Sequence, residues 1–284
     1  MSSVARALAA ATQRLREAGI ERARAEARIL LARASGLPRE ALLGAGAFTL
    51  DPETRARFEA LVARRASREP MAYVLGRRAF WTLELDVAPG VLVPRPETET
   101  LVEAALEAFP QRDSPLRVLD LGTGSGCLLA AVLSEFPKAF GVGVDRCPRA
   151  LALARANLEK LGLAARAALL CADWGRALVG RFALVVCNPP YVASSELARL
   201  DPEVARFEPR AALDGGPDGL DAYRALLPDL PRLLAPEGIV CLEVGAGQAE
   251  RVRALAESRG FAVTPRADLA GIPRCLVLRR APSG

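Results

Sequence analysis

From Leu116 onward, short apolar runs rich in Val, Leu and Ile alternate with longer segments of helical periodicity. Uninterrupted apolar runs are typical of strands buried on both faces, and their alternation with helices predicts a doubly wound α/β domain with a mostly parallel sheet. Such sheets bind ligands at the carboxyl ends of their strands. The expected strands are Leu116–Leu119, Phe140–Val144, Ala167–Cys171, Phe182–Cys187, Ile239–Val244, Phe261–Val263 and Cys275–Leu278. The expected helices are Cys127–Phe136, Arg149–Leu161, Leu220–Leu234 and Gln248–Ser258.

The helix expected over residues 220–234 contains Pro228 and Pro231. Proline lacks the amide hydrogen that a helix needs, and its ring clashes with the preceding turn, so we expect a kink or a break there. The prolines are distant in sequence from the pocket predicted below, and we expect no consequence for its chemistry.

Residues 1 to about 70 have the pattern of a small helical bundle without a catalytic constellation. A first helix is expected to end at Gly19 and a second to run from about Arg22 to Ala34, while Asp51-Pro52 has the form of a helix N-cap followed by proline. The buried positions of the first helix are expected to be Val4, Leu8, Ala11 and Leu15. We assign residues 1–75 to a helical N-terminal domain that either binds a partner or packs on the main domain.

A β-hairpin is expected between the two domains. Residues 80 to 87 alternate in polarity, as in a half-buried strand. The residues on its apolar face are Trp81, Leu83, Leu85 and Val87. Pro89-Gly90 predicts a turn, after which Val91-Leu92-Val93 runs back as a second strand. We therefore assign residues 76–93 to a linking hairpin and residues 94–284 to the α/β domain.

The composition excludes several classes of enzyme. The 284 residues include no histidine, which removes Ser-His-Asp and Cys-His catalysis and makes a zinc site unexpected. The six cysteines are not spaced as metal ligands, and we expect small buried hydrophobes in a reducing compartment. The net charge of +5 permits a nucleic-acid partner without requiring one. No run approaches a membrane span and the start lacks a secretory signal, so we expect a soluble, cytoplasmic protein.

The first expected strand runs into a glycine-rich loop, Asp120-Leu121-Gly122-Thr123-Gly124-Ser125-Gly126, which a helix follows. Glycines let the backbone approach a ligand, and the helix N-terminus favours a negative group. Asp145 ends the next strand and can accept hydrogen bonds from both ribose hydroxyls of an adenosine moiety. The GxGxG spacing favours S-adenosylmethionine over a dinucleotide, because S-adenosylmethionine has no pyrophosphate group for the loop to bind. The expected cofactor contacts here are Gly122, Thr123, Gly124, Ser125, Gly126 and Asp145.

Asp173-Trp174 follows the third expected strand. Asp173 can accept a hydrogen bond from the adenine amino group, and Trp174 can stack on the adenine ring. A capping aspartate and a buried tryptophan are the alternative interpretation. In the predicted sheet the ends of the first four strands are neighbours, so these two residues are expected to line one crevice with the glycine-rich loop and Asp145.

Asn188-Pro189-Pro190-Tyr191 ends the fourth expected strand. The prolines cannot donate ladder hydrogen bonds and restrict the residues before them, so the strand must stop in a stiff corner. The Asn188 side-chain carbonyl and the Pro189 backbone carbonyl can accept from both hydrogens of a substrate NH2 group, and Tyr191 offers a flat face. All four residues are expected to hold the substrate for catalysis, with Asn188 also beside the cofactor. A proline-terminated loop without a role in catalysis is the alternative.

The segment Pro94-Arg95-Pro96-Glu97-Thr98-Glu99 is rigid and charged. It has the form of a helix start with acidic residues near the N-terminus, and Arg95 and Glu97 are also candidates for binding the substrate. The connection Val192–Gly219 is long, and long loops in compact domains are often lids or binding loops.

Together these motifs resemble the protein-(glutamine-N5) methyltransferases that modify peptide chain release factors, and the resemblance spans nearly the whole chain. The segment Asn188–Tyr191, taken by itself, is shared with enzymes that methylate amino groups of DNA and RNA. Pro94–Glu99 and the long connection Val192–Gly219 restrict the resemblance to the protein-(glutamine-N5) methyltransferases. The other matching segments are Pro70–Gly76, the hairpin around Phe80, Phe207–Leu213, Asp214–Leu220 and Leu242–Gly245 with Gln248.

The resemblance implies a Rossmann-like class I S-adenosylmethionine-dependent methyltransferase domain with a small N-terminal helical bundle and a linking β-hairpin. It implies methyl transfer from S-adenosylmethionine, leaving S-adenosylhomocysteine, to the side-chain nitrogen N5 of the glutamine in a release factor's Gly-Gly-Gln motif. The helical domain would help to hold the release factor. Gly122–Gly126, Asp145, Trp174 and Asn188 would contact the cofactor, and Asn188–Tyr191 would hold the glutamine. We expect a monomer without metal, stable nucleic-acid partner or membrane.

Three other functions remain open at this stage. A nucleic-acid methyltransferase acting on adenine or guanine amino groups is compatible with the segment Asn188–Tyr191 and with the net charge of +5. Against it, only 5% of the residues are aromatic and the sequence has no basic, aromatic-rich module. A non-catalytic binding protein with a vestigial cofactor fold is disfavoured by the intact glycine loop, Asp145 and Asn188. A nicotinamide dehydrogenase is disfavoured by the GxGxG spacing.

Overall fold

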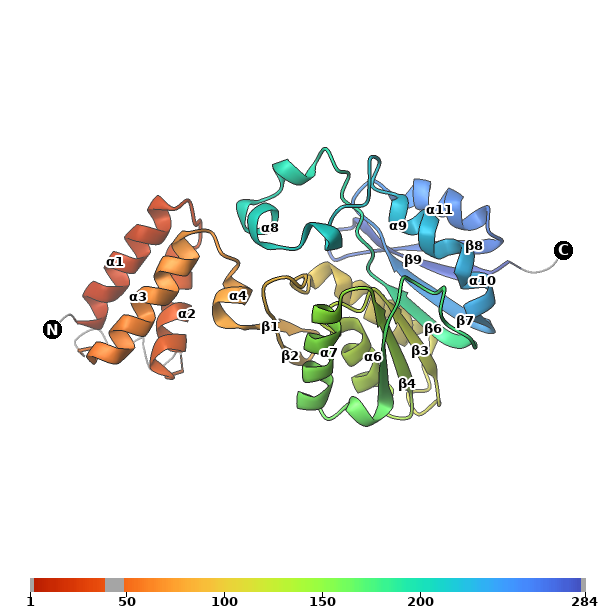
Figure 1. The fold of residues 1–284 in the computed structure, drawn as a ribbon, viewed down its shortest axis with the longest axis horizontal. Coiled ribbons are helices and arrows are strands. Elements are labelled where there is room, and N and C mark those ends of the chain that lie inside the picture. The colour runs from red at the N-terminus through yellow and green to blue at the C-terminus, as the bar shows by residue number, and fades with distance from the viewer. Residues whose placement is uncertain (1–2, 39–48, 282–284) are drawn as a thin grey trace. The chain divides into compact units, whose positions relative to one another are not determined.

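The computed structural model describes residues 3–38 and 49–281 of a chain that divides into two compact units (Figure 1). The first unit comprises Met1–Gly76 with Asp201–Phe207, and the second comprises Arg77–Leu200 with Glu208–Gly284. Within the described ranges, no helix is long and apolar enough to cross a membrane.

The first unit is a helical bundle, as expected. Its helices are α1 (Val4–Glu17), α2 (Ala23–Ser35), α3 (Pro52–Ala66), α4 (Met71–Leu75) and, from later in the chain, α8 (Pro202–Phe207). The Asp51 carboxylate accepts a hydrogen bond from Thr54 N at 2.8 Å, so the predicted N-cap of α3 is confirmed. Of the positions expected to be buried in α1, Val4, Ala11 and Leu15 are buried and Leu8 is half-buried.

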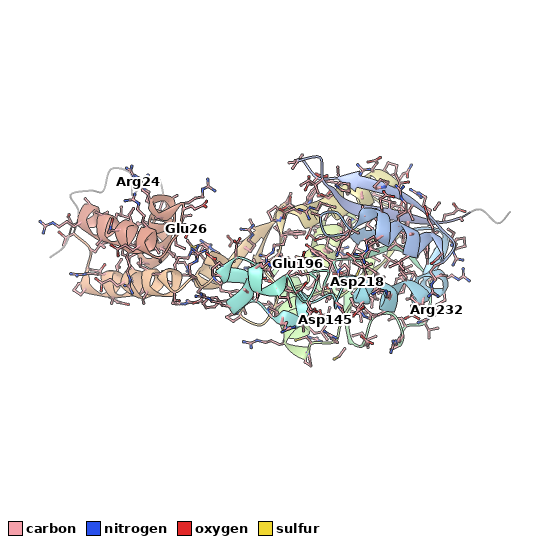
Figure 2. The ribbon with its side chains drawn as sticks, turned by 90° about the horizontal axis from the view of Figure 1, so that it is seen from above. Arg24, Glu26, Asp145, Glu196, Asp218 and Arg232 are labelled. Carbon is pink, nitrogen blue, oxygen red and sulfur yellow. The ribbon has the colours of Figure 1, made fainter. Side chains whose placement is uncertain are left out.

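A nearly buried arginine fixes α8 to the rest of the first unit. Arg65 on α3 has a side chain that is only 7% exposed, and it pairs with Glu26 of α2 at 2.6 Å and with Glu203 of α8 at 3.0 Å; Figure 2 labels Glu26. Arg68 adds a second ion pair to Glu203 at 2.7 Å. A buried guanidinium is tolerated only where carboxylates pair with it, so these contacts hold together segments that lie 138 positions apart.

The second unit is built on a seven-stranded sheet of order β5-β4-β3-β6-β7-β9-β8. Strands β3 to β7 pair in parallel, and β9 is antiparallel to both β7 and β8, which confirms the predicted mostly parallel sheet. The strands are β3 (Arg117–Leu121), β4 (Phe140–Asp145), β5 (Ala167–Cys171), β6 (Phe182–Cys187), β7 (Leu234–Glu243), β8 (Phe261–Ala267) and β9 (Pro273–Arg280). The expected and observed bounds of β5 and β6 coincide.

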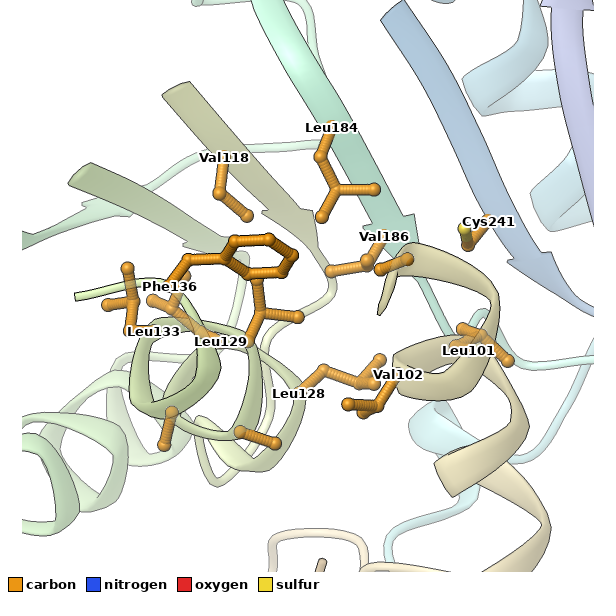
Figure 3. Close-up of a cluster of buried hydrophobic side chains, with 14 of the residues drawn as sticks. Leu101, Val102, Val118, Leu128, Leu129, Leu133, Phe136, Leu184, Val186 and Cys241 are labelled. Atoms are coloured by element: carbon orange, nitrogen blue, oxygen red, sulfur yellow. The ribbon is translucent and has the colours of Figure 1, made fainter. Parts of the chain in front are cut away.

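Helices cover both faces of this sheet. They are α5 (Glu99–Ala108), α6 (Cys127–Glu135), α7 (Pro148–Lys160), α9 (Asp221–Leu226), α10 (Leu230–Leu233) and α11 (Ala249–Glu257). Side chains of α5 and α6 pack with Val118, Leu184 and Val186 in one buried hydrophobic cluster (Figure 3). The alternate residues Leu119 and Val185 face a second cluster with α9, α10 and α11. Burial of both faces explains why a central strand such as β6 is continuously apolar.

The hairpin turns at a different place from the one expected. Its strands are β1 (Arg77–Phe80) and β2 (Leu83–Asp86), so the turn falls at Trp81-Thr82. The expectation of one strand over residues 80 to 87 that pairs with a returning strand Val91–Val93 is therefore wrong, although the expected turn at Pro89-Gly90 is present after β2.

Tertiary contacts of Trp81 explain this difference. Trp81 adopts a left-handed φ of 55° in the turn. Its backbone N–H donates to Glu99 Oε1 at 2.9 Å, and its indole N–H donates to Glu135 Oε1 at 2.7 Å. Two hydrogen bonds to carboxylates outweigh the local alternation of polarity, which is a weak determinant of strand structure by comparison.

Pro228 and Pro231 break the expected helix, as predicted. α9 ends at Leu226, a 3-10 turn spans Leu227–Asp229, and α10 occupies only Leu230–Leu233. The polypeptide then enters β7 at Leu234, earlier than expected, with a register shift opposite β6.

All six cysteines are free thiols. Cys187, Cys241 and Cys275 are buried, as expected for small hydrophobic residues, and Cys127 and Cys147 are half-buried. The expectation of burial is wrong for Cys171, which is exposed because it ends the edge strand β5.

A buried asparagine attaches the hairpin to the rest of the second unit. Asn157 on α7 accepts a hydrogen bond from Asp86 N at 2.8 Å, and its amide donates to Asp86 O at 3.0 Å and to Ser125 O at 2.9 Å. Asn157 is completely buried. One side chain therefore satisfies backbone groups of both β2 and the glycine-rich loop.

Asn157→Ala is expected to lower the free energy of unfolding by about 2 to 3 kcal/mol, because three backbone groups would lose their partner at a buried position. Denaturant titration measures this change. Arg155→Ala, at an exposed position of the same helix, is the control and should change stability by less than about 0.5 kcal/mol. Similar effects of the two substitutions would contradict the role given to Asn157.

Candidate active site

The carboxyl ends of β3, β4, β5 and β6 meet at one edge of the sheet, because these strands are parallel neighbours. A cavity of about 410 Å³ lies there, a volume typical of small-molecule sites. The expected site residues that line it are Arg95, Gly122, Thr123, Gly124, Ser125, Asp145, Asp173, Trp174, Asn188 and Pro190. Figure 2 labels Asp145, which ends β4.

Four of the expected site residues do not line the cavity. Gly126 is the N-cap of α6, and Glu97 is exposed. Pro189 is buried, and Tyr191 packs against the second hydrophobic cluster. The functional roles given to these four residues stay predictions.

Hydrogen bonds fix the glycine loop (Gly122–Gly126) to the end of β4. Gly122 N donates to Val144 O at 2.8 Å, and Gly124 N donates to Asp145 Oδ2 at 2.9 Å. Gly122 has a φ of +76°, and a Cβ atom added there would stand 3.6 Å from the Trp174 ring. A side chain at this position would therefore be strained and would narrow the cavity.

The carboxylate of Asp145 is engaged on both oxygens. Oδ2 accepts from Gly124 N, and Oδ1 accepts from Cys147 N at 2.8 Å. Each carboxylate oxygen has a second acceptor position, so Asp145 can hold the loop and still bind hydroxyl groups in the cavity. The sequence indicated that Asp145 can bind hydroxyl groups, but it did not indicate that Asp145 holds the glycine loop.

Asp173 and Trp174 differ in how firmly they are held. Asp173 is exposed, and its carboxylate lies 3.6 Å from the Arg176 guanidinium. Trp174 is half-buried, has a left-handed φ of 52°, and places its ring over Gly122. A bulky residue in this conformation is strained, and such strain is concentrated at functional sites.

The side-chain amide of Asn188 is oriented by Thr98. Asn188 Nδ2 donates to Thr98 Oγ1 at 3.0 Å. The remaining polar atom of the side chain, Oδ1, is therefore available in the cavity as a hydrogen-bond acceptor. Thr98 is 1% exposed, so this contact is shielded from solvent.

Tyr191 is held by its hydroxyl and by its backbone. The hydroxyl donates to Glu243 Oε1 at 3.2 Å, and the carbonyl accepts from Gln248 Nε2 at 2.8 Å. Burial and the neighbouring Glu243 raise the pKa of Tyr191 well above its ordinary value, so the phenol remains protonated. A Cβ atom added at Gly245 would stand 3.0 Å from the Tyr191 ring, which explains the need for a small residue there.

Two buried carboxyl groups lie at this edge: Asp120, which was expected to line the crevice but was given no role, and Glu243, which was not selected as a site residue from the sequence. Asp120 and Glu243 are each 1% exposed, and burial raises the pKa of each to about 7. Thr123 Oγ1 donates to Asp120 Oδ2 at 2.6 Å. Asp120 Oδ1 and Glu243 Oε2 have no hydrogen-bond partner among the described residues. An acidic residue inside or at the end of an apolar run is the sequence signal that points to both.

Arg95 is held by a buried carboxylate from the long connection. Glu208 has a side chain that is 1% exposed, and it accepts from Arg95 Nη2 at 2.6 Å and from Val93 N at 3.2 Å. The same connection contributes Pro209, Ala211, Ala212 and Asp214 to the cavity lining. The ion pair therefore fixes part of the cavity wall.

Comparison with protein families matches both parts of the chain. The model of the PrmC N-terminal domain matches residues 6–76, and the model of the methyltransferase small domain matches residues 98–202. A release factor glutamine methyltransferase of Rhodospirillum rubrum is 46% identical over 95% of this chain and 83% of its own length.

Two solved structures are also similar. A protein-(glutamine-N5) methyltransferase (release factor-specific) from Alicyclobacillus acidocaldarius is 31% identical, with a TM-score of 0.42 over 70% of this chain and 100% of its own. A 16S rRNA methyltransferase of T. Thermophilus in complex with AdoMet and guanosine is 22% identical, with a TM-score of 0.53 over 72% of this chain and 49% of its own. The latter similarity shows a shared fold only.

Glu243→Gln is expected to gain stability relative to the natural chain as pH rises. Because burial raises the pKa of Glu243 from 4.5 to about 7, the stability contributed by this carboxyl is present below about pH 4.5 and is lost as pH rises through about 7. Between pH 5 and pH 8, the difference in free energy of unfolding should shift by roughly 2 kcal/mol in favour of the variant. Denaturant titrations at both pH values measure it, and a constant difference would contradict the raised pKa.

Proposed function

The chain belongs to the release factor glutamine methyltransferases, and we propose that the cavity beside Asn188 is where it methylates a release factor. The reaction transfers a methyl group from S-adenosylmethionine to the side-chain nitrogen N5 of a glutamine, which we place in the Gly-Gly-Gln motif. The observation that carries this proposal is the orientation of Asn188, whose amide nitrogen is bound to Thr98 and whose oxygen is left to accept from a substrate amide.

The residues around the cavity fit S-adenosylmethionine. Asp120 Oδ1 is a buried acceptor without a partner, and an ammonium group such as that of the cofactor's methionine portion would satisfy it. Asp145 retains acceptor positions for ribose hydroxyls, and Trp174 offers a ring to the adenine. When bound, the cofactor supplies an electrophilic methyl group on a positively charged sulfur. The product would be S-adenosylhomocysteine.

Asn188 and Pro189 would prepare the substrate amide for attack. An amide nitrogen is a poor nucleophile, because its lone pair is delocalised into the carbonyl group. Acceptance of one hydrogen by Asn188 Oδ1, which belongs to a residue lining the cavity, would raise electron density on nitrogen and fix its direction; the Pro189 carbonyl is proposed to accept the other, although Pro189 does not line the cavity. Positioning of this kind carries much of the catalysis when no strong base is present. After the nitrogen–carbon bond forms, the positively charged nitrogen releases one proton to solvent.

Other parts of the chain would serve substrate recognition. We assign residues 1–75 to binding of the release factor, residues 76–93 to a connecting hairpin and residues 94–284 to methyl transfer. Arg95, Glu97, Pro190 and Tyr191 would complete the binding of the glutamine and its neighbours. We further propose that the protein acts as a cytoplasmic monomer, without a metal ion, a stable nucleic-acid partner or a membrane.

Incubation of the protein with methyl-labelled S-adenosylmethionine and a release factor is expected to label the factor. A factor with its Gly-Gly-Gln glutamine changed to alanine should stay unlabelled, because the accepting nitrogen is absent. Mass spectrometry of the labelled peptide locates the added methyl group. Cofactor binding without label on either factor would overturn the proposal and direct attention to amino groups of nucleic acids.

Substitutions of Asn188 and Asp145 are expected to separate turnover from cofactor binding. Asn188→Ala should lower kcat by about 100-fold while the Kd for the cofactor changes little, because Asn188 orients the accepting amide. Asp145→Ala should raise that Kd by about tenfold or more, because hydrogen bonds to a charged group are lost. Single-turnover rates and calorimetric titration measure the two quantities. Equal losses of both in Asn188→Ala would contradict this division of roles.

A further inference from the structure

The side-chain amide of Gln248 joins three segments of the second unit. Its Nε2 donates to Tyr191 O at 2.8 Å and to Gly219 O at 3.4 Å, and its Oε1 accepts from Gly245 N at 3.1 Å. These partners belong to the corner Asn188–Tyr191, to the end of the long connection and to the loop that follows β7. Two carbonyl groups and one N–H group are satisfied together only by a correctly oriented amide.

The local structure does not explain a glutamine at this position. Gln248 is the N-cap of α11, and its side chain makes no hydrogen bond to the first turn of that helix. Short side chains that accept from those backbone N–H groups are preferred at an N-cap, and glutamine is not among them. The donors of this side chain are used instead on backbone carbonyls that lie 57 and 29 positions away.

Glycines on two sides allow the close approach of these segments. A Cβ atom added at Gly219 would stand 2.5 Å from both Gln248 Nε2 and Tyr191 O, and one added at Gly245 would stand 2.7 Å from Gln248 Oε1. A side chain at either position would therefore displace the amide from its partners. The arrangement around Gln248 requires particular residues from all of the segments that it joins.

The corner is stiff enough to pass a displacement from one end to the other. The rings of Pro189 and Pro190 fix φ at two consecutive residues, and Asn188 is restricted because a proline follows it. Before the corner, Cys187 is held in the sheet by its pairing with β7. A shift at Tyr191 is therefore absorbed by few free torsions and reaches the side chain of Asn188.

The position of Tyr191 depends on groups outside the long connection. The backbone N–H and carbonyl of Val192, the next residue, hydrogen-bond the far end of the same connection at 2.9 and 2.8 Å. These bonds join the connection to itself and do not attach it to the sheet. Among the described residues, two side chains outside the connection hydrogen-bond Tyr191: Glu243 at the hydroxyl and Gln248 at the carbonyl. Gln248 is the one that holds the backbone.

We propose that Gln248 is a positioning residue for methyl transfer, which holds the Tyr191 carbonyl and thereby fixes the corner where Asn188 receives the substrate amide. This inference rests on the proposed function, because it requires Asn188 to accept from that amide. Gln248 does not line the cavity. Its loss therefore lowers turnover much more than it lowers affinity for the cofactor.

Two substitutions of Gln248 test this role. Gln248→Glu keeps the length and an acceptor for Gly245 N, but it places a carboxylate oxygen opposite the carbonyls of Tyr191 and Gly219. It should lower kcat by about tenfold or more while the Kd for S-adenosylmethionine changes by less than about twofold, because a small misplacement of the accepting group slows the reaction. Gln248→Met, which has similar length and no charge, should also lower kcat by about tenfold.

Gln111→Glu is the matched control. It makes the same chemical change at an exposed glutamine of the same unit, which does not line the cavity. It should retain the natural kcat. Single-turnover rates with saturating release factor and calorimetric titration with cofactor measure the two quantities, and denaturant titration establishes that each variant is folded under the assay conditions.

The outcomes separate this inference from the proposed function. If the natural chain binds cofactor but does not methylate the release factor, both fail together. If the natural chain is active and both Gln248 variants match Gln111→Glu, only the role of Gln248 is overturned. A cofactor Kd that rises as much as kcat falls would also overturn it, because the whole cavity would then be distorted. Loss of folding in both variants would assign Gln248 to stability and overturn it as well.

Discussion

The cavity depends on the parallel pairing of β3 with β4 on one side and with β6 on the other. This pairing brings the glycine loop, Asp145 and Asn188 to one edge, although each follows a different strand. Strand ends in such a sheet expose backbone groups without ladder partners, and those groups must be satisfied locally. Here Gly122 N donates a hydrogen bond to Val144 O, and Gly124 N donates one to the Asp145 carboxylate. The same constraint that completes the fold thus shapes the wall of the cavity before any ligand is present.

Two buried carboxyl groups at this edge reduce the stability of the folded state at neutral pH. Burial raises the pKa of both Asp120 and Glu243, so the folded state disfavours their ionised forms at neutral pH. Each also has an oxygen without a partner among the described residues. A fold selected for stability alone would place amides or apolar side chains here. The proposed function gives Asp120 a role, since an ammonium group would satisfy its unpaired oxygen, while Glu243 accepts a hydrogen bond from the Tyr191 hydroxyl.

How far the sequence predicted the structure differs from one part of the molecule to another. The strands β5 and β6 were predicted with their observed bounds. Burial on both faces explains this for β6, whose apolar run ends at a polar residue and proline, whereas β5 is an apolar run at the edge of the sheet. The meeting of Asp145, Trp174 and Asn188 at one cavity followed from the strand order. The hairpin turn was misplaced, because long-range bonds to Glu99 and Glu135 hold Trp81 in a conformation that local alternation does not indicate. The contacts of Thr98 and Glu208 could not be predicted, since their partners lie 90 and 113 positions away.

The hydrogen-bonding capacity that remains after folding indicates what the cavity binds. Asp145 has used one acceptor position on each oxygen for the backbone, and Asn188 has used its donor on Thr98. What remains toward the cavity is mostly acceptors: the second positions of Asp145, Asp120 Oδ1 and Asn188 Oδ1. A ligand set that matches them must be rich in donors, with hydroxyl groups, a cationic amine and an NH2 group. An adenosyl amino acid together with a side-chain amide supplies all three, whereas a dinucleotide with its anionic pyrophosphate would face Asp120 and Asp145 with like charge.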